Sequence, residues 1–162
     1  MRHLRSRLGG AVCVAVVVSL PVGTAGAVAR WQGTAPAATV ARGPVLGSKS
    51  FAGPRGVGWG TYRPREIFNG GDPSGMITSI TWTGWGNPTA TGYGKGWIFK
   101  PGGGYYANAV TVELRADTLG HCTAAGPAAY RHLAVAEPSR PGGPLGKWFS
   151  WSGAKTLCHF GF

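Results

Sequence analysis

Hydrophobic and polar residues alternate most regularly in "AVTVELRAD", residues 109–117. One set of alternate positions is apolar and the other is polar or charged: Val110, Val112, Leu114 and Ala116 against Thr111, Glu113, Arg115 and Asp117. Successive side chains of a β-strand point to opposite faces of its sheet. The segment therefore predicts a strand with one face in a core and the other in water.

Two segments before it have related patterns. "MITSITWT", residues 76–83, predicts a half-buried strand with Met76, Thr78, Ile80 and Trp82 on one face and Ile77, Ser79, Thr81 and Thr83 on the other. Gly84 follows it and predicts a bulge or bend. In "ATGYGKGWIFK", residues 90–100, glycine occupies every second position from 92 to 96. One face of that strand lacks side chains and admits a large ring, so we expect Trp82 to cover it.

Three more segments complete the expected strands. "TYRPREIF", residues 61–68, is interrupted by Pro64 and is expected at a sheet edge. "AYRHLAVAE", residues 129–137, and "KWFSWSG", residues 147–153, are the others. Turn-forming residues recur at intervals of about ten, which is typical of antiparallel β structure. The expected fold is all-β, a small antiparallel β-sandwich or barrel with one disulfide, forming a single domain over residues 59–162.

The first 27 residues have the pattern of a secretory signal peptide. Three arginines precede an apolar run, residues 8–20, and the small residues Ala25-Gly26-Ala27 follow. A membrane-spanning helix needs roughly 20 apolar residues, so a permanent anchor is the weaker alternative. We expect an extracellular protein, associated with the cell wall or released, that keeps no membrane attachment after cleavage.

Residues 28–58 are rich in Ala, Gly and Pro and contain no acidic residue. They lack a sustained period of either strand or helix, so they predict a flexible leader. Trp31 and Phe51 are its aromatic residues. Either ring could dock onto the domain or onto a partner.

Net charge adds an expectation about partners. Removing residues 1–27 lowers Lys plus Arg from 16 to 13 against 5 acidic residues, which leaves a charge of +8. A basic exported protein is attracted to anionic polymers. Its cations are scattered singly from Arg30 to Lys155, so the sequence shows no nucleic-acid footprint. The expected partners are a cell-wall polysaccharide or another anionic polymer, or a secreted protein.

Two cysteines remain after residue 27, Cys122 and Cys158. In an exported chain such a pair predicts a disulfide. The neighbouring His121 and His159 supply a zinc alternative. Adjacent residues of an extended strand point to opposite faces, which disfavours a shared metal. No metal or other cofactor is expected.

Three stretches, "GGDPSGMITSITWTGWGNPTATGYG", "AVTVELRA" and "HCTAAGPAAYRHLAV", together with Cys158, resemble a group of small exported proteins of high-GC Gram-positive bacteria, whose function is uncharacterised. The resemblance covers roughly residues 66–136 and consists mainly of strand motifs. It implies export and a β domain. It brings no catalytic residues with it.

The sequence contains no G-x-S-x-G, H-E-x-x-H or phosphate-loop motif. Glu113 and Asp117 share a face, but four residues of strand place them about 13 Å apart, beyond the separation of glycosidase carboxylates. Glu66, Asp72 and Glu137 could pair only through space. A hydrolase with carboxylates assembled in space is therefore the last alternative, and no catalytic residue is predicted.

Aromatic residues are abundant from residue 59 onward, and rings with a polar edge suit recognition surfaces. A small core with few aliphatic residues also needs rings, so we expect Trp82 and Trp97 in the core. Trp85, after the glycine bend, and Tyr105 and Tyr106, in the loop "PGGGYYAN", are the predicted ligand-binding residues.

These observations predict a secreted, non-catalytic binding or cell-envelope-associated module. The main alternative is an inhibitor or toxin-like interaction protein. Such a protein would present "RPGGPLG", residues 140–146, or "KPGGGYY", residues 100–106, to another secreted protein.

Overall fold

The computed structural model describes residues 43–159, and the predicted signal peptide, residues 28–42 of the predicted leader and residues 160–162 lie outside this range. The elements are β1 (Val45–Leu46), β2 (Thr61–Tyr62), β3 (Ile67–Phe68), the 3₁₀ turn η1 (Pro73–Gly75), β4 (Met76–Thr83), β5 (Ala90–Gly96), β6 (Val110–His121), β7 (Ala128–Ala136), β8 (Phe149–Ser150) and the 3₁₀ turn η2 (Trp151–Gly153).

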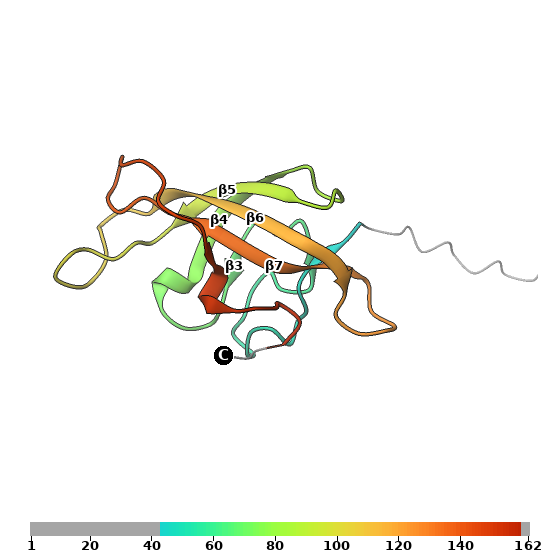
Figure 1. The fold of residues 1–162 in the computed structure, drawn as a ribbon. Coiled ribbons are helices and arrows are strands. Elements are labelled where there is room, and N and C mark those ends of the chain that lie inside the picture. The colour runs from blue at the N-terminus through green and yellow to red at the C-terminus, as the bar shows by residue number, and fades with distance from the viewer. Residues whose placement is uncertain (1–42, 160–162) are drawn as a thin grey trace, which may run out of the picture. The chain divides into compact units, whose positions relative to one another are not determined.

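All strands belong to one curled sheet, a half-barrel, which confirms the all-β fold (Figure 1). The strand order is β2-β1-β7-β6-β5-β4-β3, and β8 pairs with β7 beside this path. Every pairing is antiparallel except β1 with β7. The segment "TYRPREIF" forms two strands, β2 and β3, at the two edges of the sheet, on either side of Pro64. Because so few residues join them, the sheet must curl.

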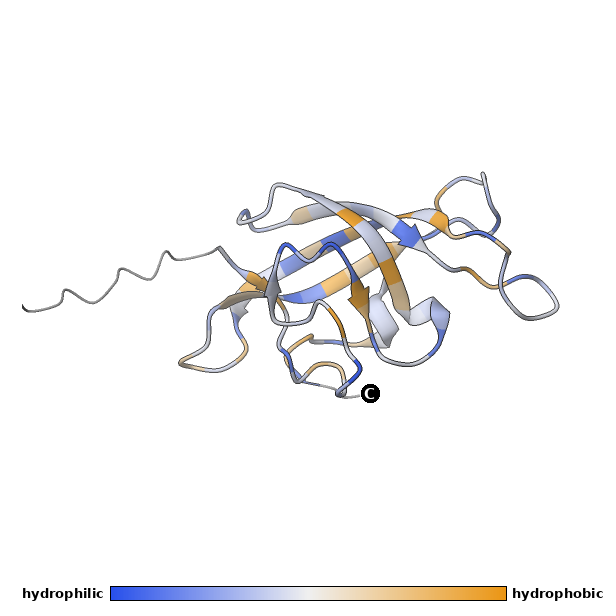
Figure 2. Ribbon diagram, turned by 180° about the vertical axis from the view of Figure 1, so that it is seen from behind, coloured by the Kyte–Doolittle hydropathy of each residue, from blue (hydrophilic) through white to orange (hydrophobic). Residues whose placement is uncertain are grey.

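The concave face of the sheet carries the core. Along β6, Val112, Leu114 and Ala116 are at most 1% exposed, while the alternate residues Thr111 and Arg115 are exposed and Glu113 is half-buried. This is the alternation predicted for the segment. Figure 2 shows hydrophobic and hydrophilic positions following one another along the strands. Burial of the apolar set drives the sheet to curl around this face.

The expected packing of Trp82 on the glycine face is confirmed. Trp82 lies directly opposite Gly92 in the β4–β5 register and is 3% exposed. A Cβ atom added to Gly92 would lie 2.8 Å from Cε3 of the Trp82 ring. At Gly94, an added Cβ would lie 2.5 Å from Cγ2 of Ile77. Both glycines are needed because core side chains occupy the space that a β-carbon would take.

The predicted division of β4 into two faces is wrong in its first half. Ile77, Ile80 and Trp82 are all buried, whereas the prediction put Ile77 on the opposite face. The pairing with β5 shifts register between Thr78 and Thr81, and Ser79 between them has a φ of 55°. This bulge adds one residue to the strand, so the residues before it and after it follow opposite alternations and Ile77 shares the buried face with Ile80 and Trp82. At Gly84, where we expected a bulge or bend, the chain bends into the turn that follows the strand, and Asn87 N–H donates to the Gly84 carbonyl.

The flexible leader does not extend to residue 58. β1 lies inside the sheet, between β2 and β7, and Leu46 is fully buried. Phe51 is 1% exposed and its ring contacts Trp59 at a centroid distance of 4.5 Å. Residues 43–58 therefore belong to the β domain, because their apolar side chains complete its core.

The C-terminal segment departs from the prediction as well. In place of a strand over residues 147–153, the chain forms the two-residue β8 and then η2. The predicted disulfide is confirmed: Cys122 and Cys158 are bonded, with their Cα atoms 4.9 Å apart. Nδ1 of His121 is hydrogen-bonded to the Gly126 carbonyl at 2.9 Å. Residues 43–159 contain no cluster of three potential metal ligands, and no helix among them is long and apolar enough to cross a membrane.

Candidate functional site

Trp85, the first predicted ligand-binding residue, is half-buried in a cluster of rings. Its ring lies 4.8 Å from Trp82 and 4.9 Å from Tyr130, between centroids. Its indole N–H donates to the Pro44 carbonyl at 2.8 Å. The polar edge that would orient a ligand is thus bonded to the chain's own backbone. Ligand binding by Trp85 stays a prediction.

Tyr105 and Tyr106, the other predicted residues, are both half-buried but lie in different surroundings. Tyr106 packs against the core. Tyr105 stacks on Phe99 with centroids 4.6 Å apart, and its hydroxyl donates to Oγ of Ser74 at 3.2 Å. Phe99 is 59% exposed, the most exposed large hydrophobic residue in the described part of the chain. Tyr105 therefore supports an exposed ring, and that ring lines a pocket.

This pocket, which we call the aromatic pocket, has a volume of about 240 Å³. Its lining comes from η1, from β8 and η2, and from the segments after β5 and β7, which leave the same end of the sheet (Figures 1 and 2). Four rings, one carboxyl group, two hydroxyl groups and a glycine form its walls: Trp97, Phe99, Phe149, Trp151, Glu137, Ser74, Ser152 and Gly75. Trp97 was expected in the core, but it is half-buried and lines this pocket.

One side of the aromatic pocket is held by Asn69. Its side-chain oxygen accepts the Trp151 indole N–H at 2.9 Å, and its side-chain nitrogen donates to Oγ of Ser152. Trp151 is only 4% exposed, so this wall is fixed by the core. On the other side, Phe99 and Phe149 are both exposed. The aromatic pocket therefore has one buried wall, at Trp151, and one exposed apolar wall, at Phe99 and Phe149.

Glu137 is the charged residue of the aromatic pocket. It follows β7 directly and is half-buried. Burial raises the pKa of its carboxyl group because it removes water from the charged form. Within residues 43–159, no lysine, arginine or histidine forms an ion pair with it. A half-buried carboxylate beside two hydroxyl groups can accept hydrogen bonds from a ligand.

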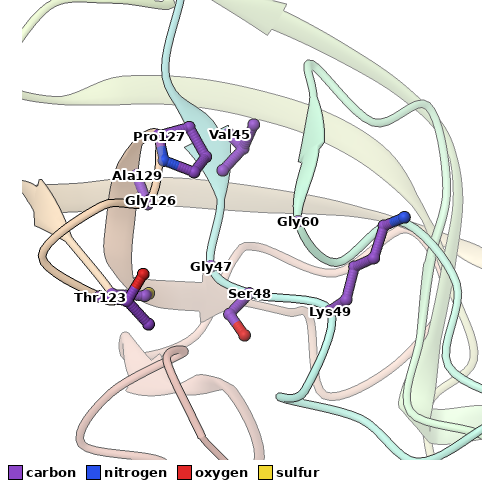
Figure 3. A pocket seen from close by; sticks show the side chains of 10 residues that line it. Val45, Gly47, Ser48, Lys49, Gly60, Thr123, Gly126, Pro127 and Ala129 are labelled. Carbon is purple, nitrogen blue, oxygen red and sulfur yellow. The ribbon is translucent and has the colours of Figure 1, made fainter.

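A second hollow, of about 310 Å³, lies beside the disulfide (Figure 3). Small side chains and glycines line most of it, among them Val45, Pro127 and Ala129. Figure 3 shows the Lys49 side chain extending away from Thr123 and Pro127. The hollow has no aromatic wall and no carboxyl group. It therefore offers fewer oriented contacts than the aromatic pocket.

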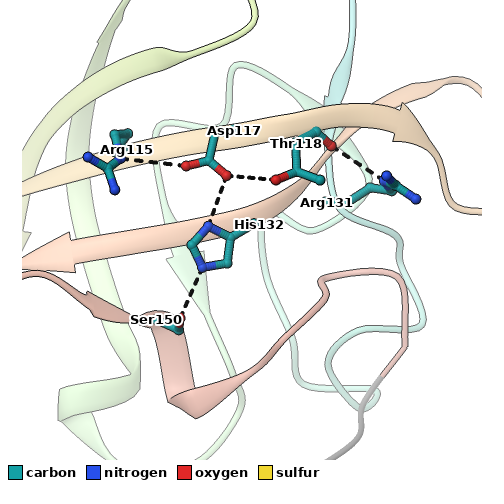
Figure 4. A network of polar contacts seen from close by, with 6 residues as sticks. All are labelled: Arg115, Asp117, Thr118, Arg131, His132 and Ser150. Carbon is teal, nitrogen blue, oxygen red and sulfur yellow. Dashed lines mark hydrogen bonds and ion pairs between the residues drawn. The ribbon is translucent and has the colours of Figure 1, made fainter.

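The convex face of the sheet carries a polar network that the sequence did not reveal (Figure 4). Asp117 in β6 and His132 in β7 are direct partners across the two strands, and Oδ1 of Asp117 lies 2.9 Å from Nδ1 of His132. The other ring nitrogen, Nε2, lies 3.0 Å from Oγ of Ser150 in β8. These three side chains form a continuous line from carboxylate to imidazole to hydroxyl. All three residues are half-buried.

Neighbouring groups hold the carboxylate end of this line. Thr118 donates its hydroxyl to Oδ1 of Asp117 at 2.9 Å, and Nε of Arg115 lies 3.5 Å from Oδ2. The Arg115 guanidinium in turn lies over the exposed Trp148 ring, 5.0 Å from its centroid. Sequence alternation predicted the outward direction of Asp117. It could not give the register that brings His132 and Ser150 to it.

No family model matches the chain, and no curated protein or solved structure is significantly similar to it.

Proposed function

We propose that this protein is an exported binding module that holds a segment of cell-wall polysaccharide in the aromatic pocket. The observation that supports this most directly is a pocket lined by four rings and by a carboxyl group that forms no ion pair within residues 43–159. Sugars offer apolar C–H faces to aromatic rings and hydroxyl groups to carboxylates, and pockets that bind small ligands combine these two features. The volume of about 240 Å³ suits one saccharide unit or a chain end.

Two further observations support export. Residues 1–27 have the composition of a signal peptide. The bond between Cys122 and Cys158 is of a kind that persists in oxidising compartments and is rare in the cytosol. Outside the cell, the charge of +8 after cleavage would draw the protein toward anionic wall polymers. In this proposal, charge brings the module to the wall and the aromatic pocket retains it there.

Co-sedimentation with purified cell wall and with insoluble polysaccharides, at low and at high salt, tests the proposal. High salt screens the general attraction between charges, so the fraction retained there measures the pocket. We expect wild type to be retained at high salt and Phe99→Ala to be lost. Trp148→Ala is the matched control, because it removes an exposed ring that does not line the aromatic pocket. Its retention should equal that of wild type.

Other results would contradict the proposal in distinct ways. Retention at low salt alone would reduce binding to net charge. Loss in Trp85→Ala with full retention in Phe99→Ala would move the site to the Trp82–Trp85 cluster. Loss in Glu137→Gln with full retention in Phe99→Ala would indicate a cationic ligand, because glutamine keeps the shape and hydrogen bonding but not the charge. Failure to bind any polysaccharide would favour a secreted protein as the partner.

A further inference from the structure

We propose that Ser150 is a nucleophile, activated by His132 and positioned through Asp117, and that the convex face of the sheet carries an acyl-transfer site. The inference goes beyond the binding function and does not depend on the aromatic pocket. It also departs from the expectation of a non-catalytic module. The arrangement is recognised by geometry: a nucleophile within reach of a base, and a base oriented by a third group.

The hydrogen bonds determine the proton positions of the His132 ring. An ionised carboxylate only accepts hydrogen bonds, so Nδ1 of His132, 2.9 Å from Asp117, must carry a proton and donate it. In the neutral ring Nε2 then has its lone pair exposed, and the Ser150 hydroxyl, 3.0 Å away, donates to it. This is the tautomer that a general base needs in order to take a proton from serine.

The backbone places Ser150 beside His132. Ser150 pairs with Ala134 in the β7–β8 ladder, two residues along β7 from His132, so the two side chains lie on the same face of the sheet. The Ser150 side chain makes no capping hydrogen bond to η2, and its hydroxyl lies 3.0 Å from Nε2 of His132.

The reaction proceeds in two balanced steps. Oγ of Ser150 bonds to the carbonyl carbon of an ester while its proton passes to Nε2 of His132. The bond from that carbon to the alkoxy oxygen breaks, and the departing oxygen takes the proton from Nε2, which leaves an acylated serine and a free alcohol. Water then attacks the acyl carbon, gives one proton to Nε2, and releases the carboxylic acid as Ser150 recovers the proton.

The expected rate is low. The site formed by these three side chains includes no donor for the developing oxyanion among the contacts that residues 43–159 provide, and losing one such donor costs about 10²–10³ in rate. Arg115 also forms an ion pair with the Asp117 carboxylate, and this competing contact weakens the interaction of Asp117 with His132. We therefore expect reaction with activated esters and sulfonyl fluorides, and slow release of the acyl group.

Labelling of the purified protein with phenylmethanesulfonyl fluoride is the direct test. Oγ displaces fluoride, so each modified chain gains one sulfonyl group, which intact-mass and peptide mass spectrometry locate. We expect one adduct, at Ser150, with none in Ser150→Ala and at least a tenfold slower reaction in His132→Gln. Ser139→Ala changes an exposed serine in the loop after β7 and should label at the wild-type rate.

Asp117 is a positioning residue, so its test needs a readout that folding alone would not change. In Asp117→Asn the amide cannot fix the Nδ1 tautomer. We expect loss of the downfield imidazole N–H resonance in the proton spectrum together with a drop in labelling rate, while the melting temperature and the disulfide mass are retained. Equal labelling in wild type and His132→Gln, or an adduct on a residue other than Ser150, would overturn the inference even where wall binding succeeds.

Discussion

Two groups of aromatic rings in the described part of the chain differ in their contacts: the rings of one group are bonded to the backbone, and the other group includes exposed rings. In the first, the polar ends of Trp82, Trp85 and Tyr130 are all bonded to the chain's own backbone, through the carbonyls of Pro64, Pro44 and Asn87 at 2.7–2.8 Å. In the second, around the aromatic pocket, Phe99 and Phe149 are exposed, and Glu137 has no ion-pair partner in the described part of the chain. Rings whose polar ends are bonded to the backbone stabilise the fold, whereas the exposed rings around the aromatic pocket are the ones to which we assign the proposed recognition.

Removal of Trp82 should have the largest effect. Trp82→Ala deletes a buried ring that fills the space above Gly92, and we expect unfolding to become easier by about 3–5 kcal/mol. Urea denaturation measures the change. Trp148→Ala, which removes an exposed ring of the same type, should cost less than about 1 kcal/mol. Similar losses in the two variants would break the distinction between structural and exposed rings.

Opening the disulfide should come next. Cys122→Ser combined with Cys158→Ser removes a link between residues 36 positions apart in sequence, and the chain-entropy model gives a loss of about 3–4 kcal/mol. The link anchors the segment that follows η2, where Leu157 is 1% exposed. Hydrogen exchange at Trp151 and Leu157 should rise before exchange in β6. An equal rise in hydrogen exchange at Trp151, at Leu157 and in β6 would show that the segment around η2 does not unfold separately from the sheet.

At the exposed wall of the aromatic pocket, the effect should fall on affinity and spare stability. Phe99→Ala removes a ring that is 59% exposed, so we expect a change in unfolding free energy below about 1 kcal/mol. Polysaccharide retained at high salt should fall at least tenfold, which corresponds to about 1.4 kcal/mol. Parallel denaturation and co-sedimentation make the check. A large loss of stability would place Phe99 with the structural rings.

Glu137 should give the smallest effect, and its pH dependence has a definite sign. Because burial raises its pKa, the folded chain holds the proton to a higher pH than the unfolded chain. Its contribution to stability is therefore complete below the ordinary pKa of 4.5 and is lost as pH rises from there through the raised pKa of the folded chain. We expect Glu137→Gln to stabilise the protein at pH 7 by less than about 1 kcal/mol, since water screens the half-exposed group.

Thermal unfolding of wild type and Glu137→Gln at pH 7 and at about pH 3.5 measures this difference. The gain should disappear at the lower pH, where Glu137 is protonated in both the folded and unfolded chain. Destabilisation by the glutamine at pH 7 would mean that the carboxylate has a favourable partner in the folded protein.

Local patterns predicted those parts of the fold that depend on neighbours in sequence. Alternation fixed the faces of β6, and glycine spacing identified the surface that Trp82 covers, because both signals repeat every second residue. The bulge at Ser79 escaped prediction because a serine with a φ of 55° carries no distinct signature. The same limitation applies to β1: two residues in an Ala-, Gly- and Pro-rich segment show no period.

The sites were harder to predict than the strands because they assemble across the fold. The sequence predicted Tyr105, which stacks on the pocket residue Phe99 but does not line the pocket itself. It suggested Glu137 only as a possible member of a carboxylate pair. Asp117, His132 and Ser150 lie on three different strands, and their approach depends on the pairing of β6 with β7 and of β7 with β8. A single sequence gives no register, so no motif search could find this array.

The parallel strand β1 also bears on the order in which the chain can fold. Val45 pairs with Ala129, and Leu46 with Tyr130. The strand β1 therefore cannot form its parallel pairing until β7 is available. Contacts between such distant residues form slowly, because a long loop must close before they contribute. In a chain that is made or threaded from its N-terminus, β1 lacks this partner until β7 has emerged. This parallel pairing can therefore form only after most of the described domain has emerged.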